Sequence, residues 1–171
     1  MNFKLLISEK EISEKISELA AEIDTVLRDD EVIVIGVLKG ALFFMADLLR
    51  KMKTKVVYDF IQAKSYEGME TTGKIKILKE PSTDFTGKTV LIVEDILDTG
   101  ITLSQIKRYF EERKAKKVYI CTLLNKRKRR VSDIDADFTG FEIEDHFVIG
   151  YGLDYDEKMR ELKDIYIVKQ C

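Results

Sequence analysis

The stretch from Lys88 to Ser104 constrains the fold more than any other part of this sequence. Thr89 to Val93 is a short, unbroken and largely β-branched apolar run, which is typical of a strand buried on both faces of a parallel sheet. Three acids follow it closely, and Ile101 to Arg113 then has apolar residues at helical spacing. The order predicts a strand, an acidic turn and a helix.

Such a turn can bind a phosphate. Open parallel sheets bind ligands beyond the carboxyl ends of their strands, and the free N–H groups at the start of the next helix form an anion site. The run from Thr99 to Thr102 supplies backbone donors and two hydroxyls there. Glu94, Asp95 and Asp98 would repel a phosphate unless they held a metal ion, accepted hydrogen bonds from a sugar diol or took a proton. The plain alternative is that Asp98 or Thr99 caps the helix and the other acids are solvated loop residues.

Length and composition indicate one domain in the cytoplasm. The 171 residues suit a single domain, residues 1–171, with an ample core. A hydrophobic content of 45% and a charged content of 35% indicate a soluble globular protein, and no apolar run approaches the length of a membrane span. The N-terminus turns acidic too soon for a secretory signal, and Cys121 and Cys171 suggest no disulfide framework. We therefore expect a cytoplasmic protein with no membrane partner.

The chemistry of a metal site is limited by the same composition. One histidine and no Cys-x-x-Cys pair give no support for a zinc site, so oxygen ligands would have to hold any metal ion. Such ligands favour magnesium or calcium. The net charge of −2, from 29 basic and 31 acidic residues, gives no general attraction for nucleic acid, and no nucleic-acid partner is expected.

The rest of the chain alternates predicted strands and helices. This alternation implies a mostly parallel sheet with right-handed crossovers. We find no internal repeat and no linker. The expected elements are a helix that follows a capping box at Ser8 to Glu11 and ends at Asp29-Asp30, a helix at 41–52, strands at 32–38, 56–63, 75–78 and 117–124, and an edge strand at 165–168.

Three polar segments lie at or near predicted strand ends. Lys39-Gly40 forms a strand-to-helix junction, which is either a plain turn or a place where a ligand approaches the backbone closely. The segment 64–73 is either a mobile connector or a lid, and its residues alone favour the connector. The basic run from Lys126 to Arg130 is either a solvated loop or a nucleic-acid patch, although Lys126 itself follows a strand beside the presumed site.

The run from Val90 to Leu103 resembles the phosphoribosyl-pyrophosphate signature of the type I phosphoribosyltransferases. Further segments narrow the resemblance to the hypoxanthine(-guanine) phosphoribosyltransferases, and together they cover roughly Val32 to the end. The resemblance implies an α/β fold in which helices flank an open, mostly parallel twisted sheet and the C-terminal part forms a small hood. The further segments are 38–40, 65–66, 126–127, 137–138, 140–142 and 147–155.

This resemblance also implies an activity. The enzyme would transfer the 5-phosphoribosyl group of phosphoribosyl pyrophosphate to N9 of hypoxanthine or guanine. The transfer depends on magnesium, releases pyrophosphate and gives inosine or guanosine monophosphate for purine salvage. The family further implies a homodimer or homotetramer. It often has a cis peptide between the residues that match Leu38 and Lys39, and we predict one here.

Roles follow by position from the same resemblance. Asp98 is implied to be the general base at purine N7, and Glu94 and Asp95 the carboxylates for the ribose diol and magnesium. Asp154 is implied to lie near a second metal and the 2-amino group. The other implied contacts are the 5′-phosphate cradle of Asp98, Thr99, Gly100, Ile101 and Thr102, the pyrophosphate site of Leu38, Lys39, Gly40 and Arg160, the purine contacts Lys126, Phe147, Val148 and Asp154, and the lid at Ser65 and Tyr66.

Two other classes of protein compete with the enzyme. One is a catalytically silent nucleotide- or RNA-binding regulator on the same fold, which would grip phosphates with Lys126 to Arg130. The other is a phospho-accepting receiver domain, suggested by the run Val-Leu-Ile-Val-Glu-Asp. Intact Asp98, Lys126, Ser65-Tyr66 and Arg160 argue against the regulator. A receiver domain would carry its acidic pair near the start of the chain, whereas this motif falls mid-chain. Ile101 replaces a polar or basic residue of many relatives, which a cradle of backbone N–H groups tolerates.

Overall fold

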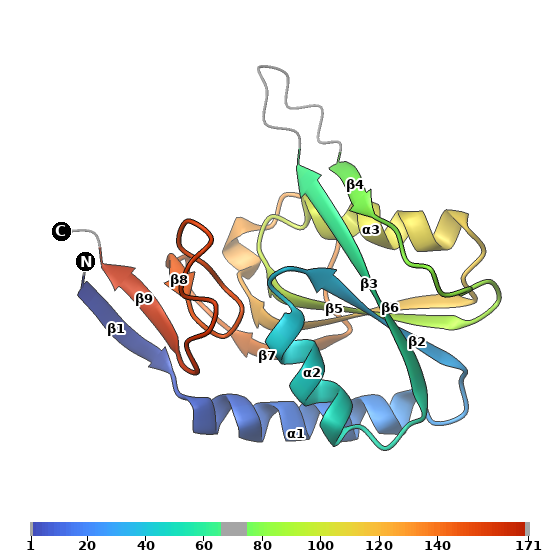
Figure 1. Ribbon diagram of the computed structural model, residues 1–171, viewed down its shortest axis with the longest axis horizontal. Coiled ribbons are helices and arrows are strands. Elements are labelled where there is room, and N and C mark those ends of the chain that lie inside the picture. Colours follow the sequence, from blue (N-terminus) through green and yellow to red (C-terminus); the bar gives the residue numbers. More distant parts are fainter. Residues whose placement is uncertain (1, 66–74, 170–171) are drawn as a thin grey trace.

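A six-stranded sheet forms the middle layer of the molecule (Figure 1). The computed structural model describes residues 2–65 and 75–169. The strands lie in the order β4-β3-β2-β5-β6-β7, all parallel except β4, which runs antiparallel to β3. The mostly parallel sheet is therefore confirmed. The strands are β2 (Val32–Leu38), β3 (Val56–Ser65), β4 (Ile75–Lys79), β5 (Thr89–Leu97), β6 (Lys117–Asn125) and β7 (Phe138–Glu142).

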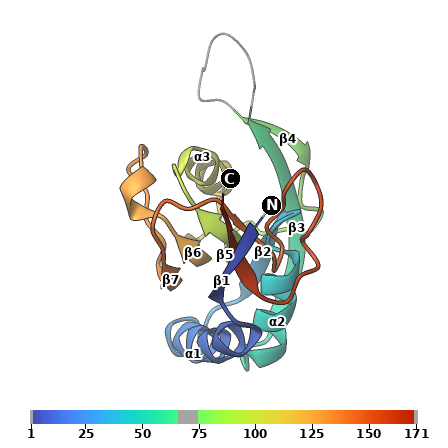
Figure 2. The ribbon, with the colours of Figure 1, turned by 90° about the vertical axis from the view of Figure 1, so that its left-hand side faces the viewer.

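Helices cover both faces of this sheet (Figure 2). α1 (Glu9–Val26) and α2 (Leu42–Lys51) pack on one face, and α3 (Ile101–Glu112) packs on the other. β5 serves both layers, because Leu91 and Val93 join the core under α1 and α2 while Val90 and Ile92 join the core under α3. These residues have no solvent exposure, as the apolar run predicted.

Local signals place the starts of the helices. Ser8 Oγ accepts a hydrogen bond from Glu11 N, and the Glu11 carboxylate accepts one from Ser8 N at 2.8 Å, so the predicted capping box of α1 is confirmed. Gly100 precedes α3 with φ +82°, a backbone conformation that favours glycine. The predicted cis peptide between Leu38 and Lys39 is also confirmed.

The prediction that β5 ends before the acids is wrong. β5 continues to Leu97, because β6 keeps pairing with it and places Glu94 opposite Thr122 and Leu97 opposite Asn125. The two adjacent acids therefore belong to the last residues of a strand, and only the residues around Asp98 form the turn. The pairing partner lies far along the chain, which local sequence does not reveal.

A second, three-stranded sheet forms the hood, which also includes the segment 150–164. Its order is β1 (Asn2–Ile7), β9 (Ile165–Lys169) and β8 (Val148–Ile149), all antiparallel. The prediction of an edge strand at 165–168 is wrong, because β1 and β8 pair with the two sides of β9. Both ends of the chain thus build the hood, beside the carboxyl ends of the central strands (Figure 1).

Two further findings complete the description. A short 3₁₀ helix, η1 (Arg127–Arg129), follows β6 within the basic run. Among the described residues, no helix is both long and apolar enough to cross a membrane.

Candidate active site

The predicted cradle and the acids meet in one pocket, which we call the active-site pocket. It lies beyond the carboxyl ends of β2 and β5, where β5 leads into α3, and has a volume of about 280 Å³. Arg160 reaches it from the hood. The lining residues are Val37, Leu38, Gly40, Ala63, Glu94, Asp95, Ile96, Leu97, Asp98, Thr99, Gly100, Thr102, Leu103 and Arg160.

The cradle, residues 98–102, is shaped as an anion site. α3 starts directly after Gly100, so its first N–H groups point toward the pocket with the positive end of the helix dipole. The first turn of α3 contains no acid that would oppose an anion. Ile101 N makes a long 3.5 Å hydrogen bond to Thr99 Oγ1. The local geometry therefore suits a phosphate group.

Glu94 and Asp95 place two carboxylates beside this anion site. Burial raises the pKa of Glu94 well above its ordinary value, and the neighbouring charge of Asp95 raises it further. Burial also raises the pKa of Asp95, although Arg160 acts in the opposite direction. A Cβ atom on Gly40 would come within 2.0 Å of the Asp95 carboxylate, so this position needs glycine. Burial therefore favours the protonated form of both carboxyl groups.

Arg160 supplies the main positive charge of the pocket. Its Nη1 donates to Gly152 O at 2.6 Å, and its Nη2 lies 2.9 Å from Asp154 Oδ1. Its Nε is buried and has no hydrogen-bond partner among the described residues. A buried guanidinium N–H without an acceptor favours an anionic ligand here, because leaving it unpaired is costly.

The hood and the loop after β2 are packed tightly. Gly152 has φ +100°, and a Cβ atom there would lie 1.9 Å from Gly40 O. Lys39 does not line the pocket, and its ammonium pairs with Glu157 at 2.5 Å. Of the predicted pyrophosphate loop, Leu38 and Gly40 line the pocket.

Asp98 joins the cradle to the basic run. Arg129 Nε lies 3.0 Å from Asp98 Oδ1 in an ion pair. The two atoms do not meet hydrogen-bond geometry, and this buried oxygen has no hydrogen-bond donor among the described residues. Arg129 also lies 3.4 Å from Asp145, which in turn lies 3.6 Å from Lys126 Nζ. A carboxylate oxygen without a donor can accept a proton from a ligand.

The predicted purine contacts lie outside the lining of this pocket. Lys126 is 6% exposed, and its N–H donates to Leu97 O at 2.9 Å, which ties it to the end of β5. Val148 is buried, whereas the Phe147 ring is 54% exposed and meets the Tyr155 ring edge-on at 5.8 Å. This exposed ring, directly before β8, offers a face on which a flat base can stack.

The acids fit a magnesium ion only in part. Among the described residues, no three carboxylate, histidine or cysteine side chains gather closely enough to hold a metal. Asp154 pairs with Arg160 and accepts from Glu157 N, so it does not complete a cluster with Glu94 and Asp95. Magnesium often uses one or two carboxylates together with water and substrate phosphates, which the Glu94–Asp95 pair can supply.

Several predicted residues need separate mention. Ile101 starts α3 but does not line the pocket. Ser65 is the last residue of β3, and Tyr66, the other predicted lid residue, lies outside the described residues. Arg129 and Gly152 were not predicted as site residues. The basic run was the sequence signal for Arg129, and the glycine-rich segment 147–155 contained the signal for Gly152.

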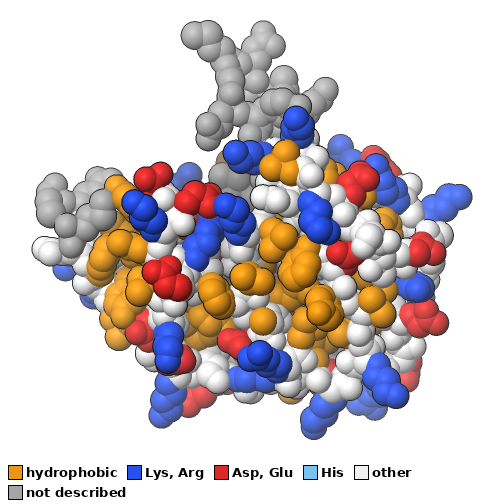
Figure 3. All heavy atoms as spheres, in the orientation of Figure 1, with side chains coloured by type: hydrophobic (Ala, Val, Ile, Leu, Met, Phe, Trp, Pro, Cys, Tyr) orange, Lys and Arg blue, Asp and Glu red, His pale blue; other side chains and the backbone are white. Residues whose placement is uncertain are grey.

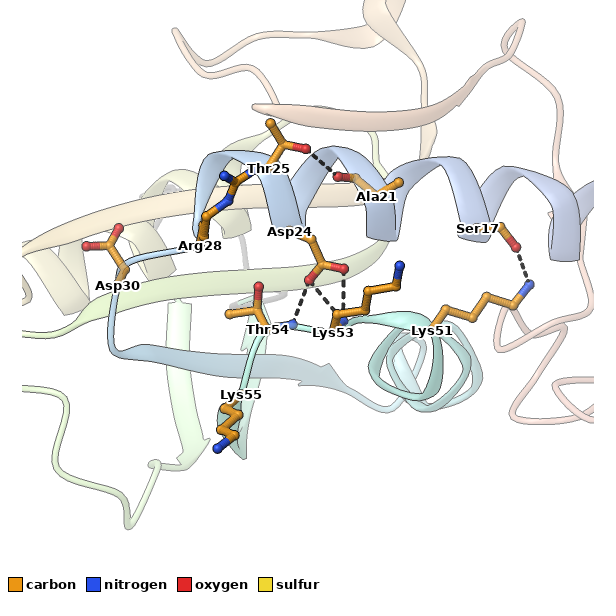
Figure 4. Close-up of a pocket in the computed structure, with 10 residues that line it drawn as sticks. All are labelled: Ser17, Ala21, Asp24, Thr25, Arg28, Asp30, Lys51, Lys53, Thr54 and Lys55. Atoms are coloured by element: carbon orange, nitrogen blue, oxygen red, sulfur yellow. Dashed lines mark hydrogen bonds between the residues drawn. The ribbon is translucent and has the colours of Figure 1, made fainter.

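A larger hollow lies at the opposite, amino-terminal edge of the parallel strands (Figure 4). Its volume is about 800 Å³, but its polar groups are used in holding α1 to the chain before β3. Asp24 accepts from Lys53 N and Thr54 N, and Lys51 Nζ donates to Ser17 Oγ at 2.9 Å. The smaller pocket is the better candidate, because Asp98 Oδ1 and Arg160 Nε have no hydrogen-bond partner among the described residues.

Comparisons with known proteins agree with this geometry. The family model of the phosphoribosyl transferase domain matches residues 7–156. The hypoxanthine-guanine phosphoribosyltransferase of Bacillus subtilis is 48% identical, with 97% of this chain and 93% of that protein covered. The hypoxanthine phosphoribosyltransferase of Escherichia coli is 43% identical over 93% of this chain and 91% of its own length.

Solved structures give the same result. A hypoxanthine phosphoribosyltransferase from Staphylococcus aureus superposes with a TM-score of 0.94 at 40% identity, and the match covers 97% of this chain and 91% of that one. The similarity extends over nearly the whole chain and includes the pocket, the hood and the signature segment around Asp98. This chain belongs to the hypoxanthine-guanine phosphoribosyltransferases within the phosphoribosyl transferase domain family.

Proposed function

We propose that this enzyme transfers the 5-phosphoribosyl group of phosphoribosyl pyrophosphate to N9 of hypoxanthine or guanine and releases pyrophosphate, as a step of purine salvage. The observation that carries the proposal is the active-site pocket itself. It combines the anion site at the start of α3, two adjacent carboxylates and the unpaired Nε of Arg160 in one place. These groups suit a phosphate, a ribose diol and a pyrophosphate respectively.

The 5′-phosphate binds the cradle, and the ribose hydroxyls donate to Glu94 and Asp95. When the bond between the anomeric carbon and pyrophosphate breaks, positive charge develops on the ribose ring and negative charge on the leaving group. The guanidinium of Arg160 and the backbone N–H groups around Lys39 and Gly40 stabilise the leaving pyrophosphate. Glu94 and Asp95 stabilise the positive charge on the ribose ring. Groups of opposite charge therefore lie on the two sides of the breaking bond.

Asp98 takes the proton that the purine gives up. Attack by N9 on the anomeric carbon leaves the base with one proton too many, and the Asp98 carboxylate accepts it at N7. Among the described residues, no group donates a hydrogen bond to its Oδ1, which supports this role. Before the purine binds, the guanidinium of Arg129 balances the negative charge of the Asp98 carboxylate.

Lys126 selects the base by the group at purine position 6. Its ammonium is buried, and Asp145, 3.6 Å away, is its only carboxylate within ion-pair distance among the described residues. Hypoxanthine and guanine offer an oxygen that accepts from it. Adenine offers an amino group and would leave the donor unpaired, which is strongly unfavourable in a buried site. Phe147 stacks on the base, while Val148 and Asp154 lie along its far edge.

Magnesium is the proposed cofactor. Glu94 and Asp95 would hold one ion together with substrate oxygens, and Asp154 would lie near a second. When bound, the ion neutralises the phosphates and makes pyrophosphate a better leaving group. Burial raises the pKa of both Glu94 and Asp95, which supports this assignment, because a bound cation would favour the ionised form of these buried carboxyl groups.

Two or four copies of the chain make up the proposed assembly. Leu42 and Phe43 on α2 and Val57 and Tyr58 on β3 are between 38% and 58% exposed. Figure 3 shows hydrophobic side chains gathered over these two elements. An apolar area of this kind is typical of an interface between copies. The cytoplasm is the proposed location, since the buried Cys121 is a free thiol.

The RNA-binding alternative has little support. The basic run carries its own counter-charges, since Arg127 pairs with Glu142 at 3.0 Å and Lys128 pairs with Glu144 at 2.6 Å. Such paired cations are poor ligands for a phosphate backbone, because an approaching RNA would have to break each pair.

A steady-state assay tests the proposed function. Pyrophosphate release is measured with phosphoribosyl pyrophosphate, magnesium and each of hypoxanthine, guanine, xanthine and adenine. We expect turnover with hypoxanthine or guanine and none with adenine, and Lys126→Met should reduce kcat/KM for the preferred base by about 10-fold or more. Equal turnover of adenine, or no turnover of any base, would contradict the proposal.

A further inference from the structure

Arg130 is a member of the basic run that none of the substrate contacts proposed above uses. Its side chain is 14% exposed and does not line the active-site pocket. The guanidinium lies behind the cradle, where Nε donates to Asp98 O at 3.1 Å, Nη1 donates to Ile134 O at 2.9 Å, and Nη2 donates to Asn125 Oδ1. Asp135, at 4.0 Å, is the nearest carboxylate in ion-pair range among the described residues. Uncharged oxygens therefore provide its main contacts.

Each backbone carbonyl of residues 97–100 accepts a hydrogen bond. Leu97 O accepts from Lys126 N, Thr99 O accepts from Val131 N and Ser132 N, and Gly100 O accepts from Ser104 N. Only Asp98 O, among these four carbonyls, receives a hydrogen bond from a side chain in the described structure, and that side chain is Arg130.

The direction of one carbonyl fixes the direction of the next N–H. In a trans peptide the C=O of one residue and the N–H of the following residue point in opposite directions. When Arg130 holds Asp98 O on the rear side, Thr99 N–H is turned to the front, toward the pocket. Within the described residues, the N–H groups of Thr99 and Gly100 donate to no protein acceptor.

The aliphatic part of Arg130 also packs against the cradle. A Cβ atom on Gly100 would lie 2.9 Å from Arg130 Cδ and 2.6 Å from Ile134 Cγ2. Gly100, with its positive φ, therefore packs directly against the Arg130 side chain. The same residue therefore supports the cradle by packing and by hydrogen bonding.

We infer that Arg130 is a positioning residue for the 5′-phosphate: by binding Asp98 O from behind, it presents the N–H of Thr99 to the phosphate. This inference rests on the proposed role of residues 98–102 as the phosphate cradle. Arg130 touches no substrate. Its effect is limited to ligands that carry the phosphate.

The test compares a ligand with and without its 5′-phosphate. Calorimetry gives the affinities of inosine 5′-monophosphate, inosine and pyrophosphate for the wild type, Arg130→Met, Arg130→Lys and the matched control Arg127→Met. Arg127 lies in the same run, is exposed and pairs only with Glu142 and Asp135 among the described residues. Thermal unfolding shows that each variant is folded at the assay temperature.

For Arg130→Met we expect the preference for the monophosphate over inosine to fall about 10-fold or more, equivalent to about 1.4 kcal/mol. Inosine and pyrophosphate affinities should stay near those of the wild type. Arg130→Lys can reach fewer acceptors than the wild type, so its preference for the monophosphate should lie between those of the wild type and Arg130→Met. If Arg130→Met does not fold, the preference of Arg130→Lys for the monophosphate over inosine tests the inference instead. Arg127→Met should keep the full preference.

The assay distinguishes a wrong inference on Arg130 from a wrong assignment of the phosphate cradle. If the wild type prefers the monophosphate and the folded Arg130 variants keep that preference, or lose all three affinities equally, the inference on Arg130 is wrong and the proposed function stands. If the wild type itself shows no preference for the monophosphate, the cradle assignment fails, and with it the basis of the inference.

Discussion

Asp98 is the residue on which the proposed chemistry depends most. Asp98→Asn keeps the shape of the side chain and removes its ability to take a proton. We expect kcat to fall by roughly 10²- to 10⁴-fold, the usual contribution of a general base, while the affinity for inosine monophosphate changes little. Steady-state kinetics and calorimetry measure the two effects.

The control for this variant is Asp133→Asn, which changes an exposed acid in the neighbouring loop. It should leave kcat unchanged. A parent-like kcat in Asp98→Asn would show that another group takes the proton.

Glu94 gives a pH-dependent prediction. Folding raises the pKa of Glu94 above its ordinary value of 4.5, so the folded protein loses stability when the group ionises. This cost is absent at pH 4, where both states are protonated, and it develops as the pH rises through the raised pKa. Glu94→Gln should therefore raise the Tm of the ligand-free protein at pH 8 by at least about 2–4 °C, roughly 1 kcal/mol at this size, and give no gain at pH 4.

Thermal scans without and with magnesium check this prediction, and Glu112→Gln, at an exposed position on α3, is the control. Magnesium should raise the Tm of the wild type more than that of Glu94→Gln. A stabilisation that is equal at both pH values, or a magnesium effect that is the same in both proteins, would contradict the proposed role of this carboxylate.

Local sequence predicts features that depend on residues close together in the chain. The acids, the glycine at the start of α3 and the capping box of α1 are each recognisable within a few positions. Arg129 and Arg130 were not identified, because their partners lie elsewhere: Arg130 donates to Asp98 O, 32 residues away. Such contacts depend on which strands become neighbours, which a basic run alone does not reveal.

At the scale of elements, the packing of the hood on the loop after β2 is the most sensitive junction. In Gly152→Ala the new Cβ atom would lie 1.9 Å from Gly40 O, so the hood must shift away from the pyrophosphate loop. We expect kcat/KM for phosphoribosyl pyrophosphate to fall by about 10-fold or more, and backbone strain of about 1–3 kcal/mol to lower the Tm.

Gly87→Ala separates these two effects. Gly87 also has a positive φ, +71°, but a Cβ atom there would meet nothing within 4 Å. This control should lose some thermal stability and keep its kcat/KM. If Gly152→Ala retained full activity, the close approach of hood and loop would have no catalytic importance.

The ends and neighbours of the strands were predicted from the sequence with mixed success. The strand at 32–38 was predicted with its observed ends, since its apolar run has clear limits. β9 was misjudged as an edge strand, because its partner β1 lies at the other end of the chain and shows no strong strand pattern of its own. β5 was cut short for the same reason, since its last residues are held by pairing with β6.

At the scale of the whole molecule, the predicted alternation of strands and helices indicated the α/β class. The unbroken apolar run of β5 indicated that helices cover both faces of this strand. The assembly is a separate question, to which the exposed apolar side chains of α2 and β3 are the best guide. We expect Tyr58→Glu to shift the protein toward the monomer, because burying a charge at an apolar interface is unfavourable.

Light scattering coupled to size-exclusion chromatography measures this shift. Val26→Glu, which changes a similarly exposed apolar residue on α1, is the matched control and should keep the assembly. An unchanged mass for Tyr58→Glu would place the interface on another surface.

The most direct test of the central claim is a crystal structure of the enzyme with inosine 5′-monophosphate. The account predicts that the phosphate oxygens lie within about 3 Å of the backbone N–H groups of the cradle, with the ribose hydroxyls at Glu94 and Asp95 and the base between Lys126 and Phe147. A nucleotide bound elsewhere, such as in the hollow beside Asp24, with the cradle empty, would contradict it.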